Sequence, residues 1–107
     1  MNLETIEKEL KTGQASPHML AEMKDWLAGE SSSMMDRQLE LTMLYAKYFN
    51  DIRGEYKSDK AVRMAWIGGE WGKEEMELET RQRKIKVLRE AISSHIRVAS
   101  DEARNLY

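Results

Sequence analysis

Residues 78–106 read LETRQRKIKVLREAISSHIRVASDEARNL, and the apolar spacing of this stretch decides the fold class. Seven-residue intervals separate five of its apolar positions: Leu78, Ile85, Ile92, Ala99 and Leu106. Three further apolar residues fill intermediate positions: Leu88, Ile96 and Ala103. This heptad pattern is typical of a helix with a coiled-coil-like seam. The stretch therefore predicts an all-α protein.

The N-terminal part of the chain keeps the same helical spacing. We expect a short amphipathic helix over residues 3–11, followed by a second helix that starts at Ser16-Pro17. Serine caps free N–H groups and proline is well tolerated at the first helical position. Gly29 is a suitable C-terminal stop. The sequence thus predicts an N-terminal helix pair over residues 3–29.

The remaining apolar positions predict a long antiparallel helical hairpin, of about residues 33–53 and 59–106, within a single helical domain over 1–107. Serines at 31–33 offer N-caps for its first helix. In its second helix, Gly68-Gly69 costs roughly 1 kcal/mol per glycine relative to alanine. A bend there and a break into two helices both fit the pattern.

Composition excludes several classes of protein. The 107 residues are 41% hydrophobic and 34% charged, with no cysteine and a net charge of −2. Disulfide frameworks and cysteine-ligated metals are thereby excluded. The first residues lack the basic and apolar stretches of a signal peptide, and no apolar run is long enough to span a membrane. We expect a cytoplasmic protein that does not bind membranes.

No constellation of residues predicts catalysis. Gly68-Gly69 has the spacing of neither common phosphate-binding loop. His18 and His95 lie far apart in the sequence and indicate no metal site, and the adjacent pair Glu74 and Glu75 is expected on a solvated helix face. We therefore predict a protein that is not an enzyme, with no catalytic residue, no metal, no cofactor and no small-molecule substrate.

Aromatic and seam residues are the candidates for protein contact. Trp66 and Trp71 flank the glycine pair, and tryptophan dominates many interfaces. The alternative is that both tryptophans fill space beside the N-terminal helices. The candidate interaction residues are Trp66, Gly68, Gly69, Trp71, Ile85, Leu88 and Ile92. Methionines could likewise fill core gaps or form an adaptable surface: Met34, Met35, Met43, Met64 and Met76.

Charges are arranged in two blocks that meet at Thr80. The acidic block covers residues 70–79 and the basic block covers residues 81–89. Ion pairs within one helix explain this order. An antiparallel homodimer that crosses near Thr80 explains it as well. The basic block also supplies candidate nucleic-acid contacts: Arg81, Arg83, Lys84, Lys86 and Arg89.

The order of several short motifs resembles a family of small uncharacterised helical proteins of tailed bacteriophages. The motifs are Ser16-Pro17-x-x-Leu20 after an early break, Trp26-Leu27-Ala28-Gly29, Ile52-Arg53, Lys57-Ser58-Asp59-Lys60-Ala61, Trp66 with Gly69, the basic stretch Lys84 to Arg89, and Glu102-Ala103-Arg104-Asn105. The resemblance implies a phage protein of the bacterial host cytoplasm, encoded near replication and recombination genes. It implies no enzymatic activity.

Three functions fit these observations. The first is a non-enzymatic interaction or adaptor protein that self-associates, with a dimer favoured, or binds a phage or host protein. The second is an accessory DNA-binding factor in phage replication or recombination, which contacts nucleic acid through the basic block. The third is an inhibitor of a host enzyme or defence complex.

Overall fold

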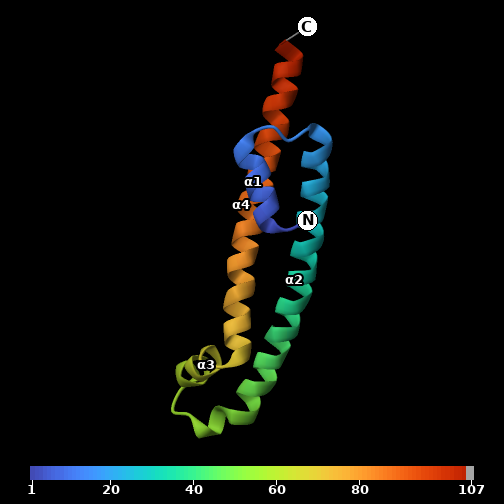
Figure 1. The fold of residues 1–107 in the computed structure, drawn as a ribbon. Coiled ribbons are helices and arrows are strands. Elements are labelled where there is room, and N and C mark those ends of the chain that lie inside the picture. The colour runs from blue at the N-terminus through green and yellow to red at the C-terminus, as the bar shows by residue number, and fades with distance from the viewer. Residues whose placement is uncertain (106–107) are drawn as a thin grey trace. The chain divides into compact units, whose positions relative to one another are not determined.

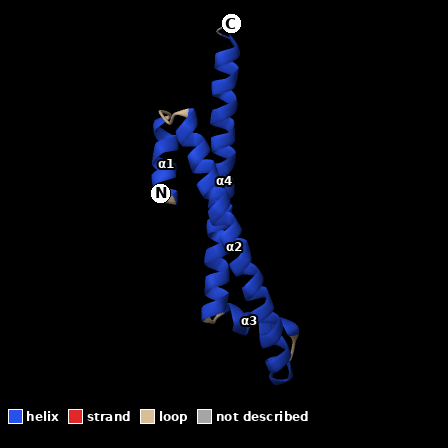
Figure 2. Cartoon of the chain, turned by 90° about the vertical axis from the view of Figure 1, so that its right-hand side faces the viewer, coloured by secondary structure: helices blue, strands red, loops and turns tan. Residues whose placement is uncertain are grey.

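The computed structural model describes the backbone of residues 1–105 and the side chains of residues 1–98. Its elements are α1 (Leu3–Thr12), α2 (Pro17–Ile52), the 3-10 helix η1 (Arg53–Glu55), α3 (Asp59–Ile67) and α4 (Glu70–Asn105). Figure 2 shows that these described residues form helices and loops without a strand. The fold is the predicted all-α helical hairpin, with α2 and α4 as its long helices (Figure 1).

The predicted helix starts are confirmed by their caps. The side-chain oxygen of Asn2 accepts a hydrogen bond from the Thr5 N–H at 2.8 Å, which caps α1. Pro17 is the first residue of α2. The Ser58 hydroxyl accepts a hydrogen bond from the Ala61 N–H at 3.1 Å and so caps α3. Each cap satisfies a backbone donor that the helix itself cannot pair.

The predicted break between residues 29 and 33 is wrong, because α2 continues through it. The helix pair over 3–29 and the separate helix from 33 therefore become α1 and one long α2. Gly29 has no positive φ and an added Cβ there would meet open space, so nothing requires a stop. Leu27, Ser31 and Met34 are buried at helical spacing across the same region. Burial of each apolar side chain stabilises by about 1.5–3 kcal/mol, which exceeds the cost of one glycine.

The two long helices have the same number of residues. Both α2 and α4 contain 36 residues. At 1.5 Å per residue each is about 54 Å long. Of the α4 seam, Ile85, Leu88 and Ile92 are buried within the chain.

At Gly68-Gly69 the helix breaks in two instead of bending. α3 ends at Ile67 and α4 begins at Glu70. The Gly69 N–H donates to the Trp66 carbonyl at 3.0 Å, in the tighter i to i+3 pattern that ends many helices. The predicted helix over 59–106 is thus two helices, and its final residue lies outside the described chain.

The chain forms two compact units, each of which combines a part of α2 with a part of α4. Unit 1 comprises Met1–Ser31 and Gln82–Tyr107. In it, α1 lies alongside the first part of α2 and the later part of α4 (Figures 1 and 2). Its buried apolar side chains are Ile6, Leu20, Met23, Leu27, Ile85, Leu88 and Ile92. The heptad seam of α4 therefore contributes to the core of unit 1.

One polar contact ties α2 to α4 inside unit 1. The Ser31 hydroxyl donates to the Gln82 side-chain oxygen at 2.9 Å, and the Gln82 amide donates to the Ser31 carbonyl at 3.0 Å. Ser31 is buried in the middle of α2, so it is a helix–helix contact and not the predicted N-cap. On the other side, Lys84 pairs with Glu7 of α1 at 3.2 Å.

Unit 2 comprises Ser32–Arg81 and contains the second part of α2, η1, α3 and the first part of α4. Its buried apolar side chains are Met34, Leu41, Val62 and Trp66. Tyr45, Tyr48 and Phe49 of α2 are half-buried beside them. This unit therefore has a core that is rich in aromatic rings.

The last features of the fold are the polarity of its helices and the extent of the α4 seam. None of their helices is both long enough and apolar enough to cross a membrane. The predicted seam continues to Ala99, Ala103 and Leu106, whose side chains lie outside the described residues.

Candidate functional site

An open pocket of about 260 Å³ lies in unit 2, where α3 meets α4. Its lining comes from the end of α2, from α3 and from the start of α4: Tyr48, Ala65, Trp66, Gly69, Glu70 and Trp71. Three of these side chains are aromatic and one is a carboxylate. The pocket therefore combines apolar walls with a single acidic group, as ligand and peptide sites often do.

Trp66 is the centre of the aromatic cluster that forms this pocket. Its ring centroid lies 5.2 Å from that of Tyr45, 5.3 Å from that of Tyr48 and 5.5 Å from that of Trp71. Trp66 is only 2% exposed, whereas Trp71 is 45% exposed. Trp66 thus forms the floor, and Trp71 is a wall that faces solvent.

The glycines of this region position the two tryptophans. The break at Gly68-Gly69 lets α4 start beside the end of α3. At Gly72, an added Cβ would overlap the carbonyl oxygen of Trp66 and lie 2.6 Å from the Cα of Ile67. Only glycine allows the backbones of α3 and α4 to approach this closely. The close approach brings the ring of Trp71 against that of Trp66.

A hydrogen-bonded ion pair fixes the Trp66 ring from behind. The indole N–H of Trp66 donates to Glu75 Oε2 at 2.8 Å. The Arg63 guanidinium donates to both carboxylate oxygens of Glu75, at 2.6 and 3.3 Å, and lies 4.9 Å from the ring centroid of Tyr45. The hydrogen bonds from Arg63 lower the pKa of Glu75, and the same bonds raise the pKa of Arg63.

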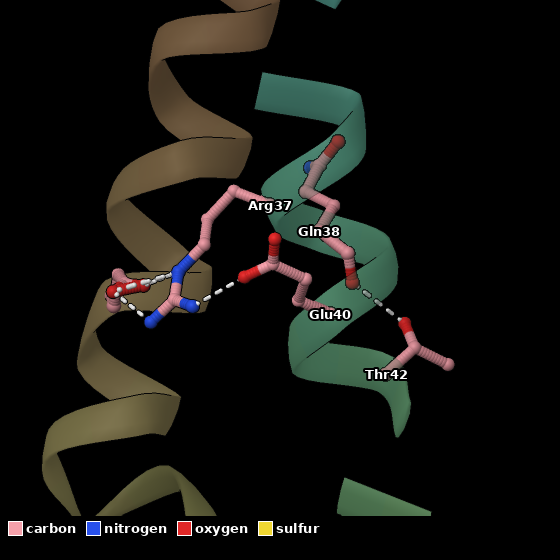
Figure 3. Close-up of polar contacts among 5 residues, drawn as sticks. Arg37, Gln38, Glu40 and Thr42 are labelled. Carbon is pink, nitrogen blue, oxygen red and sulfur yellow. Dashed lines mark hydrogen bonds and ion pairs between the residues drawn. The ribbon is translucent and has the colours of Figure 1, made fainter. Parts of the chain in front are cut away.

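A second ion pair joins α2 to α4 in the same unit (Figure 3). Arg37 Nε and Nη2 donate to the Glu74 carboxylate at 2.7 and 2.9 Å, while Arg37 Nη1 donates to Glu40 at 2.7 Å. The hydrogen bonds from Arg37 lower the pKa of Glu74 and raise the pKa of Arg37. Glu74 and Glu75 were predicted to lie on a solvated helix face. In the structure each carboxylate instead binds an arginine of another helix and so joins two helices.

The Tyr48 hydroxyl is neutral at physiological pH. Burial raises the pKa of Tyr48 above its ordinary value of 10.0, and contact with Tyr56 and the charge of Glu55 add to this shift. The pocket wall therefore presents a neutral phenol ring.

Exposed apolar side chains are concentrated in the same unit. The structure has twelve exposed large apolar residues among those described, and eight of them belong to unit 2: Met35, Leu39, Met43, Tyr56, Met64, Ile67, Trp71 and Met76. Met35, Leu39 and Met43 follow one another at four-residue spacing along α2. Of the methionines listed above, only Met34 is a core residue, and the other four lie on the surface.

The predicted interaction residues fall into two groups. Trp66, Gly68, Gly69 and Trp71 lie together at the α3–α4 junction, where Trp66, Gly69 and Trp71 line the pocket. The seam residues Ile85, Leu88 and Ile92 are buried in unit 1 and present no side chain to a partner. Sequence reasoning did not single out Tyr48 or Glu70. The spacing of Tyr48 within the aromatic run of α2 was the one available signal, and it is equally typical of core residues.

The predicted nucleic-acid contacts are exposed, but they do not all remain available. Arg81 belongs to unit 2, and Arg83, Lys84, Lys86 and Arg89 belong to unit 1. Lys84 is engaged with Glu7 across α1 and α4. Arg81 and Arg83 take part in further side-chain interactions. The basic block therefore serves partly to hold the fold together.

Two further findings concern metal-ligating groups and similarity to known proteins. In the part of the chain with described side chains, no group of three or more histidine, aspartate or glutamate side chains is arranged to hold a metal ion. The chain matched no protein-family model, no curated protein and no solved structure.

Proposed function

We propose that this chain is a non-enzymatic protein–protein interaction protein that docks on its partner through the aromatic pocket of unit 2. The observation that supports the proposal is the 45% exposure of Trp71 at the mouth of that pocket, within the unit that carries most of the exposed apolar side chains. Contiguous exposed apolar surface marks interaction sites. Tryptophan anchors in preformed pockets supply much of the binding energy at interfaces.

The methionines of unit 2 suit the same role. Met35, Met43 and Met64 are each about 60% or more exposed. Methionine has three rotatable bonds and a polarizable sulfur, so a surface that contains it adapts to the shape of a partner. Trp71 supplies a rigid aromatic anchor at the pocket, and the exposed methionines supply adaptable apolar surface in the same unit.

The partner is a second copy of this chain, with a dimer favoured, or a phage or host protein. Because Ile85, Leu88 and Ile92 of the α4 seam are buried within the chain, the proposal favours a partner that binds at the pocket. The phage origin and the host cytoplasm rest on the family resemblance alone. Inhibition of a host enzyme or defence complex is the same docking function with an enzyme as the partner.

Capture experiments with a matched pair of variants test this proposal. Tagged wild type, Trp71→Ala and Val87→Ala are each used to capture proteins from nuclease-treated lysates of phage-infected bacteria. Val87 is an exposed apolar residue of the same helix in unit 1, so it controls for loss of apolar surface. We expect a stoichiometric protein with wild type and Val87→Ala that is lost with Trp71→Ala.

Self-association is measured on the same three proteins by sedimentation velocity over a concentration series, with circular dichroism to show that each is folded. If the partner is a second copy, Trp71→Ala lowers the dimer fraction and Val87→Ala leaves it unchanged. A wild-type chain that stays monomeric and captures no protein contradicts the proposal. Capture that is equal for wild type and Trp71→Ala contradicts the role of the pocket.

Accessory DNA binding is the second candidate, and the exposure of Lys86 and Arg89 on α4 favours it. Phosphate-driven binding is strongest at low salt. The double variant Lys86→Ala, Arg89→Ala should then weaken binding to both single- and double-stranded oligonucleotides at about 20 mM salt, with a smaller dependence on salt than wild type. Absence of binding by the wild type under these conditions eliminates direct contact with DNA.

A further inference from the structure

Unit 2 already contains one site in which a cation lies on an aromatic ring. The guanidinium of Arg63 is 4.9 Å from the ring centroid of Tyr45, and the Glu75 carboxylate binds it through two hydrogen bonds. An aromatic face and a carboxylate thus hold the planar cation from two sides. Arginine suits such sites because its guanidinium stacks on rings and donates paired hydrogen bonds.

The pocket repeats these two components on the other side of the same aromatic cluster. Trp71 and Tyr48 supply aromatic rings, and Glu70 supplies a carboxylate. Among the residues whose side chains are described, no cation lies over Trp71 or Tyr48, and Glu70 takes part in no ion pair. The Glu70 carboxylate and the exposed part of the Trp71 ring therefore remain available to an external group.

We infer that the pocket receives the guanidinium group of an arginine side chain from the partner protein. This inference rests on the proposed docking function and adds the chemistry that the pocket recognises. Trp71 provides the stacking face, Glu70 the carboxylate that accepts hydrogen bonds, and Trp66 the apolar floor. The indole N–H of Trp66 is already bound to Glu75, so the floor has no donor that would compete.

The one charged side chain of the pocket lining, Glu70, also favours a cation. The start of α4 carries a partial positive charge equivalent to about half an elementary charge. The full negative charge of Glu70, in the first turn of α4, exceeds it. Glu55 lies close enough to Tyr48 to raise its pKa and adds a second negative charge. An anionic partner group would be repelled by both carboxylates.

Peptide titration followed by NMR tests the inference directly. The probe is the blocked tripeptide acetyl-Gly-Arg-Gly-amide, titrated into the full chain to millimolar concentration. The three tryptophans give three indole N–H signals, so Trp71 reports on the pocket and Trp26 of unit 1 is an internal control. We expect saturable shifts of the Trp71 signal with a millimolar dissociation constant, and no shift of the Trp26 signal.

Matched peptides separate charge from shape. The citrulline peptide has nearly the same shape without the charge, and we expect it to bind about fivefold or more weakly. We expect the lysine peptide to bind more weakly than the arginine peptide, because an ammonium group cannot stack or donate in a planar pair. Equal binding of the citrulline peptide would overturn a cation site. Equal binding of the lysine peptide would overturn the assignment to arginine.

Matched variants separate the pocket from the rest of the surface. Glu70→Gln should weaken binding of the arginine peptide about two- to fivefold, whereas Glu77→Gln, an exposed glutamate of the same helix, should not change it. Trp71→Leu should weaken binding about fivefold or more, measured through the backbone N–H of Gly69. If Glu70→Gln and Glu77→Gln behave alike, the role of Glu70 is wrong.

Two results distinguish failure of the arginine site from failure of the proposed docking function. Loss of the captured protein in Trp71→Ala with no response to the arginine peptide supports docking through the pocket and overturns the arginine ligand. Binding of the arginine peptide together with unchanged capture by Trp71→Ala supports the cation site and overturns its use in docking.

Discussion

Gly72 packs directly against the backbone of Trp66, at a distance that leaves no room for a side chain. This contact between the first turn of α4 and the end of α3 holds Trp71 against Trp66. The pocket thus depends on a residue that does not line it.

Gly72→Ala should therefore destabilise the protein, by about 1–3 kcal/mol, because the added methyl group forces the two helices apart. Gly68→Ala is the control, since a Cβ at Gly68 would make only ordinary contacts, 3.7 Å from the nearest atom. Chemical denaturation measures both changes, and near-ultraviolet circular dichroism reports the altered tryptophan pair. Equal stability of the two variants would contradict the close approach.

Gly29→Ala should stabilise the protein by about 0.5–1 kcal/mol. Gly29 lies inside α2 with open space around it, so alanine gains helix propensity at no steric cost. Gly13→Ala is the opposite case, because Gly13 caps α1 at a φ of 67° and alanine there costs about 1 kcal/mol. Thermal unfolding shows whether each variant is more or less stable than the wild type. A loss of stability in Gly29→Ala would support a break in α2 at this residue.

Ser31→Ala should cost about 1 kcal/mol, because it leaves the Gln82 side-chain oxygen without its donor. Ser33→Ala removes an exposed serine from the same helix and should be neutral or slightly stabilising. Urea denaturation of both variants measures the difference. Identical effects would show that the contact between Ser31 and Gln82 contributes nothing.

Acidification should weaken the protein through Glu74 and Glu75. Hydrogen bonds from arginine lower the pKa of each carboxylate below its ordinary value of 4.5 in the folded state. The unfolded state therefore binds protons first, and the stabilisation present above about pH 4.5 is lost as the pH falls through the folded pKa values. Urea midpoints between pH 7 and pH 3 measure this loss.

Glu75→Gln should reduce that dependence on pH, since it removes one of the two titrating groups. At pH 7 we expect it to cost about 1–2 kcal/mol, because the charged hydrogen bonds from Arg63 are lost while the Trp66 N–H keeps an acceptor. Glu77→Gln makes the same change of charge at an exposed position and should leave the profile close to that of wild type.

Periodicity predicted the helices well where caps and apolar spacing agreed. The helices expected from residue 3, from Ser16-Pro17 and from residue 59 all begin there, because a helix N-terminus needs a local acceptor wherever the chain later packs. Gly29 and the serines after it were misread as a boundary. The helix continues through them while Ser31 is buried against Gln82 of α4, a contact that is remote in sequence.

The candidate site was predicted in part. Trp66 and Trp71 were singled out from their place beside a weak point of the helix, and the structure brings them 5.5 Å apart. Gly72 and Tyr48 could not be identified in the same way. The need for Gly72 arises only from the crossing of α3 and α4. Tyr48 lines the pocket only because α3 and the start of α4 pack beside the end of α2.

For the heptad seam of α4, burial was predicted correctly but the surface that covers it was not. Ile85, Leu88 and Ile92 have the heptad spacing of an intermolecular coiled coil, yet they are buried in unit 1. Heptad spacing specifies a buried stripe and does not specify which molecule covers it. Here the seam residues share the core of unit 1 with α1 and the first part of α2.

Unit 1 is discontinuous, and this has a consequence for the order of folding. Its two segments are separated by the whole of unit 2, residues 32–81. Contacts between distant segments carry a larger loop-closure cost and form more slowly than local ones. Ile6 and Leu27 precede unit 2 in the chain, whereas Ile92, which is buried in the same unit 1, follows it. The unit that carries the pocket is contiguous, so it can mature while the first segment of the chain still awaits the last.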